Sequence, residues 1–211
     1  QGLQQRLDPM FSACDDFFFD LASRARSNAD QNRYFESLRE VRLKKARMAA
    51  DFLAAVDRGF SGFGARTGLQ AIASQGNVLL ASDLELVSHD QMERNVLVTD
   101  MVARARLEWQ QELFQLRERL MTICPPFAED QNPFDPGRLT AAFTTATEVF
   151  EVDLDILKIL YKQFDRTVML HLDEVYAPAN QRLKEAGLLP NLTPLSRRAV
   201  VRTAAHAAWA V

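Results

Sequence analysis

The sequence has few helix breakers and few cysteines. Glycine and proline each occur eight times in 211 residues, and they cluster in a few places. Scarce breakers favour long helices over many short strands. The two cysteines, Cys14 and Cys124, are too few for a disulfide framework, and both lie among apolar residues. We therefore expect buried, unpaired thiols in a reducing cytosol.

A strong excess of charge and a long apolar run are also missing. Twenty-five basic and 28 acidic residues leave a formal net charge of −3, which does not favour a protein that coats nucleic acid or a membrane surface. No apolar run reaches the ~18 residues of a transmembrane helix, and no signal peptide is recognisable. We expect a cytoplasmic protein without a membrane span. Because the chain begins at Gln1 rather than methionine, we expect it to be a piece of a longer protein.

Apolar residues recur every three or four positions along most of the chain, which is typical of helices that bury one face. Asp8-Pro9 and Asp135-Pro136 carry the residue types that begin helices. The spacing predicts an all-α, elongated bundle of five to six helices, two of them very long. The predicted helices span about 8–26, 32–62, 88–123, 135–150 and 153–175, and Pro178 kinks the last one or starts a sixth that ends at Gly187.

The helical patterns define one domain over residues 8–190. We expect residues 1–7 and 193–211 to be flexible tails. Residues 64–87 are rich in glycine and the least regular part, and a short strand pair between Asn77 and Val87 is the only sheet we expect. The seam formed by Trp109, Leu113, Leu116 and Leu120 is predicted to be buried against the helix at 32–62 or the helix at 153–175.

Four stretches resemble one known family: Asn32–Lys45 (NRYFESLREVRLKK), Leu84–Arg106 (LELVSHDQMERNVLVTDMVARAR), Asn132–Arg138 (NPFDPGR) and Leu157–Leu189 (LKILYKQFDRTVMLHLDEVYAPANQRLKEAGLL). These stretches, in the order in which they occur along the chain, are similar to domain-of-unknown-function family sixteen-thirty-one, a large family of bacterial cytoplasmic proteins. The resemblance covers roughly residues 10 to 190. It implies the N-terminal piece of a much longer protein, and no established activity comes with it.

Members of that family are often labelled thymidine phosphorylase, but the sequence lacks the motifs of such chemistry. The glycines after residue 59 follow a predicted helix rather than a strand, so they do not form a phosphate-binding loop. No Glu-x-x-His pair is present for a metal site in a bundle, and no Gly-x-Ser-x-Gly nucleophile elbow is present. We expect no enzyme, no metal site and no cofactor.

A basic segment in the helix at 32–62 is the most suggestive feature. Glu40 and Asp51 lie one turn from Lys44 and Arg47, whereas Arg42 and Lys45 have no acid one turn away. A solvated helix face is the simpler interpretation. The functional interpretation is a docking face for an acidic partner, formed by Arg39, Arg42, Lys44, Lys45 and Arg47.

The sequence thus predicts a non-enzymatic protein-interaction or regulatory module with a protein partner, and it leaves a homodimer open. Nucleic acid is not an expected partner. The alternative is a nucleotide- or cyclic-dinucleotide-sensing domain. Arg198 and Arg202 would contribute to it, because their Arg-x-x-x-Arg spacing resembles half of the cyclic-di-GMP motif of PilZ domains.

Overall fold

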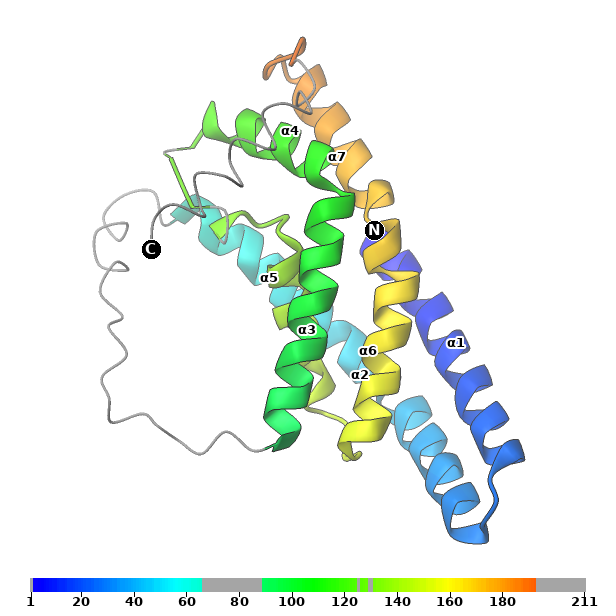
Figure 1. Cartoon of the computed structure of the whole chain (residues 1–211). Coiled ribbons are helices and arrows are strands. Elements are labelled where there is room, and N and C mark those ends of the chain that lie inside the picture. The colour runs from blue at the N-terminus through cyan, green and yellow to red at the C-terminus, as the bar shows by residue number, and fades with distance from the viewer. Residues whose placement is uncertain (1, 66–88, 125, 129–130, 193–211) are drawn as a thin grey trace, which may run out of the picture.

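All regular secondary structure in the described residues is helical. The computed structural model describes residues 2–65, 89–124, 126–128 and 131–192. The all-α bundle predicted from the sequence is confirmed (Figure 1). Residues 66–88, which include the predicted strand pair, and residues 193–211 lie outside the described residues. The elements in chain order are α1 (Gly2–Arg24), α2 (Asn28–Ala65), α3 (His89–Glu108), α4 (Gln110–Met121), α5 (Pro136–Thr147), α6 (Leu154–Thr167), the short 3-10 helix η3 (Met169–His171) and α7 (Asp173–Glu185).

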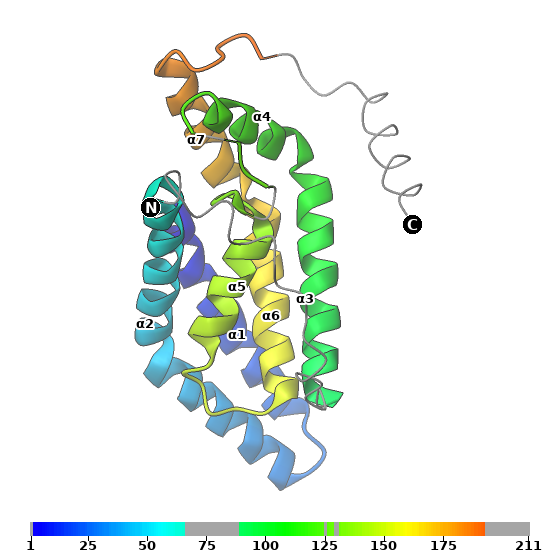
Figure 2. The ribbon, with the colours of Figure 1, turned by 90° about the vertical axis from the view of Figure 1, so that its left-hand side faces the viewer.

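An antiparallel hairpin of α1 and α2 forms one side of the bundle. The turn between them ends at Ser27, whose hydroxyl accepts a hydrogen bond from the Asp30 amide at 3.1 Å and caps α2. The helix α5 lies between α2 and α3, and α6 packs against both α1 and α3 (Figure 2). At 38 residues, α2 is a rod of about 57 Å, so the bundle is elongated along this helix.

The first helix begins earlier than the sequence predicts. We expected residues 1–7 to fray before a helix start at Asp8-Pro9, but α1 already includes Gly2 and carries Pro9 in its interior. Leu3 and Leu7 are buried in the core. Burial of these two side chains favours the helical conformation upstream of the proline and offsets the hydrogen bond that the proline cannot make. The expectation of a flexible tail was therefore wrong for residues 2–7.

The long helix predicted over 88–123 is divided at Trp109. This residue leaves the helical conformation, and its indole Nε1 donates a hydrogen bond to the Met169 carbonyl at 2.8 Å. As a result, α4 turns away from the axis of α3 and packs against α7 across the end of the bundle (Figures 1 and 2). Leu116 and Leu120 are buried as predicted, whereas Trp109 and Leu113 are half-buried. The main packing partner of α4 is α7.

Phenylalanines from three helices meet at the centre of the core. Phe52 of α2, Phe143 of α5 and Phe164 of α6 are all fully buried. The rings of Phe143 and Phe164 stack with centroids 3.9 Å apart, and Phe52 contacts both edge-on at 6.3 and 5.8 Å. Such aromatic pairs add specific geometry to apolar burial, so this cluster holds the three helices in register.

The single helix predicted over 153–175 is divided in the structure into α6, η3 and the first turn of α7. The backbone leaves the α-helix at Val168, passes through η3 and re-enters a helix at Asp173. Pro178 lies inside α7 and does not start a new helix.

No helix in the described part of the chain combines the length and apolar character that crossing a bilayer requires.

Candidate functional site: the basic segment of α2 and an apolar groove

Three of the five basic residues predicted to dock a partner have acidic neighbours. The two pairs expected within α2 form: Lys44 lies 2.6 Å from Glu40, and Arg47 lies 3.7 Å from Asp51. Arg42 also finds an acid, because Nε lies 2.9 Å from a carboxylate oxygen of Asp15 in α1. The prediction that Arg42 lacks an acidic neighbour held only within its own helix.

Lys44 connects α2 to the loop between α5 and α6. Its ammonium group donates to the Val149 carbonyl at 3.1 Å and to Glu151 at 2.9 Å. The carboxylate of Glu40 accepts from the Glu151 amide at 3.0 Å. Hydrogen bonds from Lys44 to Glu40 and Glu151 raise the pKa of Lys44. The Glu151 amide and then Lys44 lower the pKa of Glu40. These groups anchor a loop, which is a structural role.

Arg39 and Lys45 are the exposed members of the basic segment that form no ion pair with any described residue. They are six residues apart, so they point about 120° away from each other around the helix. The structure therefore separates the two free cations onto different sides of α2. The docking hypothesis for the basic segment stays a prediction, with these two residues as its remaining basis. Arg198 and Arg202 lie outside the described residues.

The segment Asn132–Arg138 forms a structural joint between helices. Asp135 caps α5 by accepting from the Gly137 amide at 2.8 Å, and it receives two hydrogen bonds from Arg106 of α3 at 2.9 and 2.8 Å. Asn132 accepts from the Phe134 amide at 3.0 Å, and the Tyr176 hydroxyl of α7 donates to the Phe134 carbonyl at 2.7 Å. The segment thus ties α3, α5 and α7 together.

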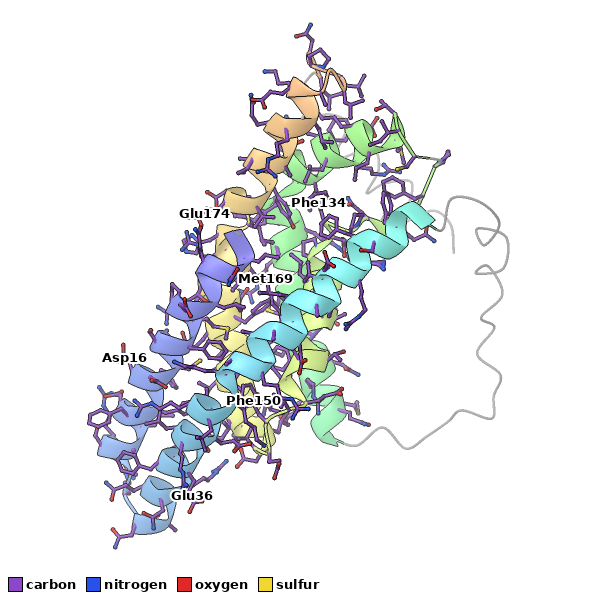
Figure 3. The ribbon with its side chains drawn as sticks, turned by 180° about the vertical axis from the view of Figure 1, so that it is seen from behind. Asp16, Glu36, Phe134, Phe150, Met169 and Glu174 are labelled. Atoms are coloured by element: carbon purple, nitrogen blue, oxygen red, sulfur yellow. The ribbon has the colours of Figure 1, made fainter. Side chains whose placement is uncertain are left out.

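An apolar groove opens beside this joint, and we call it the α2–α7 groove. In Figure 3, α1 and α2 meet at the foot of their hairpin and diverge upward, so that the N-terminal turns of α1 reach α7 and the C-terminal half of α2 does not. The groove between α2 and α7 has a volume of about 930 Å³. Its walls come from four helices and the 132–138 connector: Leu3 of α1, Leu53, Val56 and Phe60 of α2, Leu120 of α4, Phe134, and Val175, Ala179 and Leu183 of α7.

Phe60 and Phe134 form the aromatic part of this groove. Their rings meet edge-on with centroids 4.9 Å apart, and Phe60 remains 39% exposed. The position of Phe134 depends on Tyr176, which contacts its carbonyl by hydrogen bond and its ring edge-on at 6.3 Å. The buried side chain of Tyr176 therefore holds Phe134 in place, and with it the aromatic part of the groove.

Opposite charges occupy opposite rims of the groove. Asp57 lies on the α2 rim and Arg182 on the α7 rim; both are exposed and form no ion pair with a described residue. Glu174, also on the α7 side, is already engaged by Arg6 of α1, with one hydrogen bond of 2.7 Å. The groove therefore presents a free carboxylate on one side and a free guanidinium on the other.

The sequence indicated some of these residues but not their function. Val56 and Phe60 belong to the apolar line of α2 that helical spacing assigns to the core. Along the N-terminal half of α2, this side of the helix is covered by α1. Because the two helices diverge, the same line is uncovered near its C-terminal end. No sequence signal reports that divergence, since it depends on where α1 meets α7.

The described residues bring together no group of three or more His, Cys, Asp or Glu side chains that could hold a metal ion. His171 lies in the short helix η3 and is half-buried. Cys14 is fully buried, and burial, followed by the charge of Asp15, raises the pKa of its thiol to about 12. The thiol is therefore protonated at neutral pH and is a poor nucleophile.

The chain belongs to the family described as Protein of unknown function (DUF1631), N-terminal domain, which matches residues 1–187. The resemblance inferred from the four sequence stretches is thereby confirmed. No curated protein and no solved structure matches the chain. The family is defined by sequence rather than by a reaction, so function has to be argued from the geometry of the domain itself.

Proposed function

As the N-terminal domain of a DUF1631 protein, this chain is, we propose, a non-enzymatic protein-interaction module whose α2–α7 groove receives an amphipathic helix of a protein partner. The observation that carries the proposal is the groove itself: a space of about 930 Å³ with apolar walls from four helices and free charges at its rims. Helix-in-groove recognition uses an apolar helix face in this way.

A helix is the occupant that best suits the shape. The groove follows the side of α2 that α1 covers further down the hairpin, so an added helix would occupy the place that α1 leaves when it diverges (Figure 3). Leu53, Val56 and Phe60 succeed one another at spacings of three and four residues and face this space. That spacing matches the side-chain rows of a second helix packed alongside.

The rim charges specify the orientation of the partner helix. A basic residue on one flank would face Asp57, and an acidic residue on the other flank would face Arg182. Such complementarity contributes mainly to the choice of partner and to the rate of association. The apolar residues of the groove would supply most of the affinity, with Phe60 and Phe134 as aromatic anchors.

Site-specific photo-crosslinking tests the proposal. A benzoylphenylalanine placed at Phe60 should crosslink to a partner protein in cells that express the DUF1631 protein containing this domain. The same probe at Arg58, which does not line the groove, should give no crosslink. Mass spectrometry should map the crosslink to an amphipathic helical segment with one basic and one acidic flank. A crosslink that is equal at both positions, or that maps to another kind of segment, contradicts the proposal.

Binding of a synthetic peptide with the mapped sequence supplies the quantitative step. Asp57→Arg should weaken binding of this peptide about tenfold and reduce its salt dependence, since the interaction across the rim becomes repulsive. Arg58→Asp changes a charge at the next position outside the groove and should leave the affinity unchanged. Effects of similar size but opposite direction in the two variants would indicate a general electrostatic attraction instead of docking in the groove.

The absence of catalysis is part of the same proposal. It is supported by the protonated, buried thiol of Cys14 and by the structural roles of Lys44, Asp135 and Arg106. We expect the purified chain to show no phosphorolysis of thymidine above the background rate. Phosphorolysis that copurifies with the chain and is abolished by a single substitution in it would overturn this part of the proposal.

A further inference from the structure

We propose that this chain forms a two-fold symmetric dimer in which the exposed faces of two α3 helices pack antiparallel. The surface involved lies on α3 and α6, away from the residues that line the α2–α7 groove. The inference therefore goes beyond partner binding in the groove, and the two proposals can fail independently.

An apolar stripe runs along the outer side of α3. It consists of Met92, Val96, Thr99, Ala103 and Leu107, and all five side chains are exposed. The exposed fractions of Met92, Val96 and Leu107 are 58%, 62% and 74%. Spacings of three and four residues place all five on one side of the helix, over a length of about 22 Å. The core-facing residues of α3 are on its opposite side, including the buried Met101 and Ala105.

The fold leaves this side of α3 without a neighbour among the described elements. The helix lies at the edge of the bundle, with α5 and α6 packed against its inner side (Figure 2). Exposed apolar residues scattered singly are common on soluble proteins, whereas an aligned stripe marks an interaction surface. Heptad-like spacing on a straight helix fits a second helix packed alongside.

The stripe is complementary to itself when it is reversed. In an antiparallel pair centred between positions 99 and 100, Met92 meets Leu107 of the partner subunit, and Val96 meets Ala103 of the partner subunit. The two Thr99 side chains lie near the axis. Large residues thus pair at the ends, and the smaller threonine and alanine side chains allow close approach at the centre. An isologous two-fold interface requires this kind of self-complementarity.

Charges beside the stripe support the same arrangement. Asp100 and Lys162 are exposed, form no ion pair with a described residue, and line one groove of about 480 Å³ between α3 and α6. In the symmetric pair, Asp100 lies next to the two-fold axis. Lys162 of the partner subunit lines the same groove as that subunit's Asp100, so the proposed pairing brings it toward Asp100 across the axis. Two equivalent Asp100–Lys162 pairs would form, one for each subunit.

The size of the contact sets the strength that we expect. A stripe one helix wide, extended by the flank of α6, is smaller than the ~800 Å² per partner of a standard stable interface. We therefore expect a reversible dimer with a Kd on the order of 1–100 µM rather than an obligate one. Association should be visible only when the concentration is varied over this range.

Sedimentation equilibrium of the 211-residue chain tests the proposal. The unmodified chain should shift from monomer to dimer as its concentration rises through the micromolar range. Val96→Glu and Leu107→Glu should each weaken association at least tenfold, because a carboxylate would be buried in the stripe. Leu43→Glu is the matched control: Leu43 is 69% exposed on α2, and its substitution should leave association unchanged. Circular dichroism should show that all three variants stay folded.

A charge exchange makes the test specific for the antiparallel pairing. Asp100→Lys alone and Lys162→Asp alone should each weaken the dimer, whereas the double variant should restore it because the opposite charges are exchanged across the axis. A chain that stays monomeric at every concentration overturns the proposal. So does a dimer that tolerates Val96→Glu and Leu107→Glu, is disrupted by Leu43→Glu, or is not restored by the double exchange.

Discussion

Removal of one hydroxyl group, by Tyr176→Phe, tests the joint that positions the aromatic wall of the groove. Tyr176 is fully buried, and its hydroxyl donates to the Phe134 carbonyl at 2.7 Å. Phenylalanine keeps the edge contacts of the ring with Trp109 and Phe134, whose centroids lie 6.4 and 6.3 Å away. The substitution therefore removes the hydrogen bond and leaves the packing in place.

The expected cost is about 1–2 kcal/mol of unfolding free energy. A typical intramolecular hydrogen bond contributes about 0.5–1.5 kcal/mol net, and a partly buried carbonyl left without its donor adds a desolvation cost. For a chain of this size, each kcal/mol corresponds to about 2–4 °C in Tm. Tyr176→Phe should therefore melt about 2–8 °C below the parent chain, given that range.

The other two tyrosines of the chain are matched controls. The Tyr161 hydroxyl donates to Thr144 Oγ1 at 2.9 Å, but Thr144 keeps its own hydrogen bond to the Thr140 carbonyl, so Tyr161→Phe should cost less. Tyr34 is half-buried, and its hydroxyl has no hydrogen bond to a described residue. Tyr34→Phe should change stability by less than about 0.5 kcal/mol. Urea unfolding that ranks the three variants in another order would refute the reasoning.

The same tyrosine should make stability depend on alkaline pH. Burial, and then the charge of Asp135, raises the pKa of Tyr176 well above the usual 10. In the unfolded chain this hydroxyl loses its proton near pH 10, whereas the folded chain retains it, so stability is lost as pH rises above that value. Tyr176→Phe should flatten the decline in unfolding free energy between about pH 9.5 and 11. An unchanged slope would contradict a raised pKa at this position.

Three further outcomes are expected. Gly59→Ala and Gly62→Ala should each stabilise the chain by about 0.5–1 kcal/mol, because both glycines lie inside α2 and an added Cβ meets no atom of a described residue within 4 Å; a loss of stability in thermal melts would mean that these positions need glycine. A thiol reagent at neutral pH should modify the half-buried Cys124 before the fully buried Cys14, and mass mapping of a first adduct on Cys14 would contradict its burial. Leu116→Ala should cost about 2–5 kcal/mol in urea unfolding, since Leu116 is fully buried, and a cost under about 0.5 kcal/mol would place it at the surface.

Local signals in the sequence predicted the helices well where one turn contains all the relevant contacts. Asp135-Pro136 begins α5 as expected, with the Asp135 carboxylate accepting from the Gly137 amide. Asp153 likewise begins α6 by accepting from the Ile156 amide at 3.1 Å. The same Asp-Pro signal failed at Asp8-Pro9, because Leu3 and Leu7 upstream of it are buried in the core. Tertiary burial there outweighs a capping preference of about 1 kcal/mol.

Helical periodicity alone determined that this chain is an all-α bundle, that Leu116 and Phe164 lie in its core, and that Lys44 and Arg47 have acidic neighbours one turn away. Only the tertiary structure decided that Arg42 pairs with Asp15, 27 residues earlier, and that the helix after residue 88 breaks where the Trp109 indole reaches Met169. The groove and the open side of α3 belong to the same class of property. Each depends on contacts between residues far apart in the chain, and a repeat of three or four residues carries no information about which helix will cover a given face.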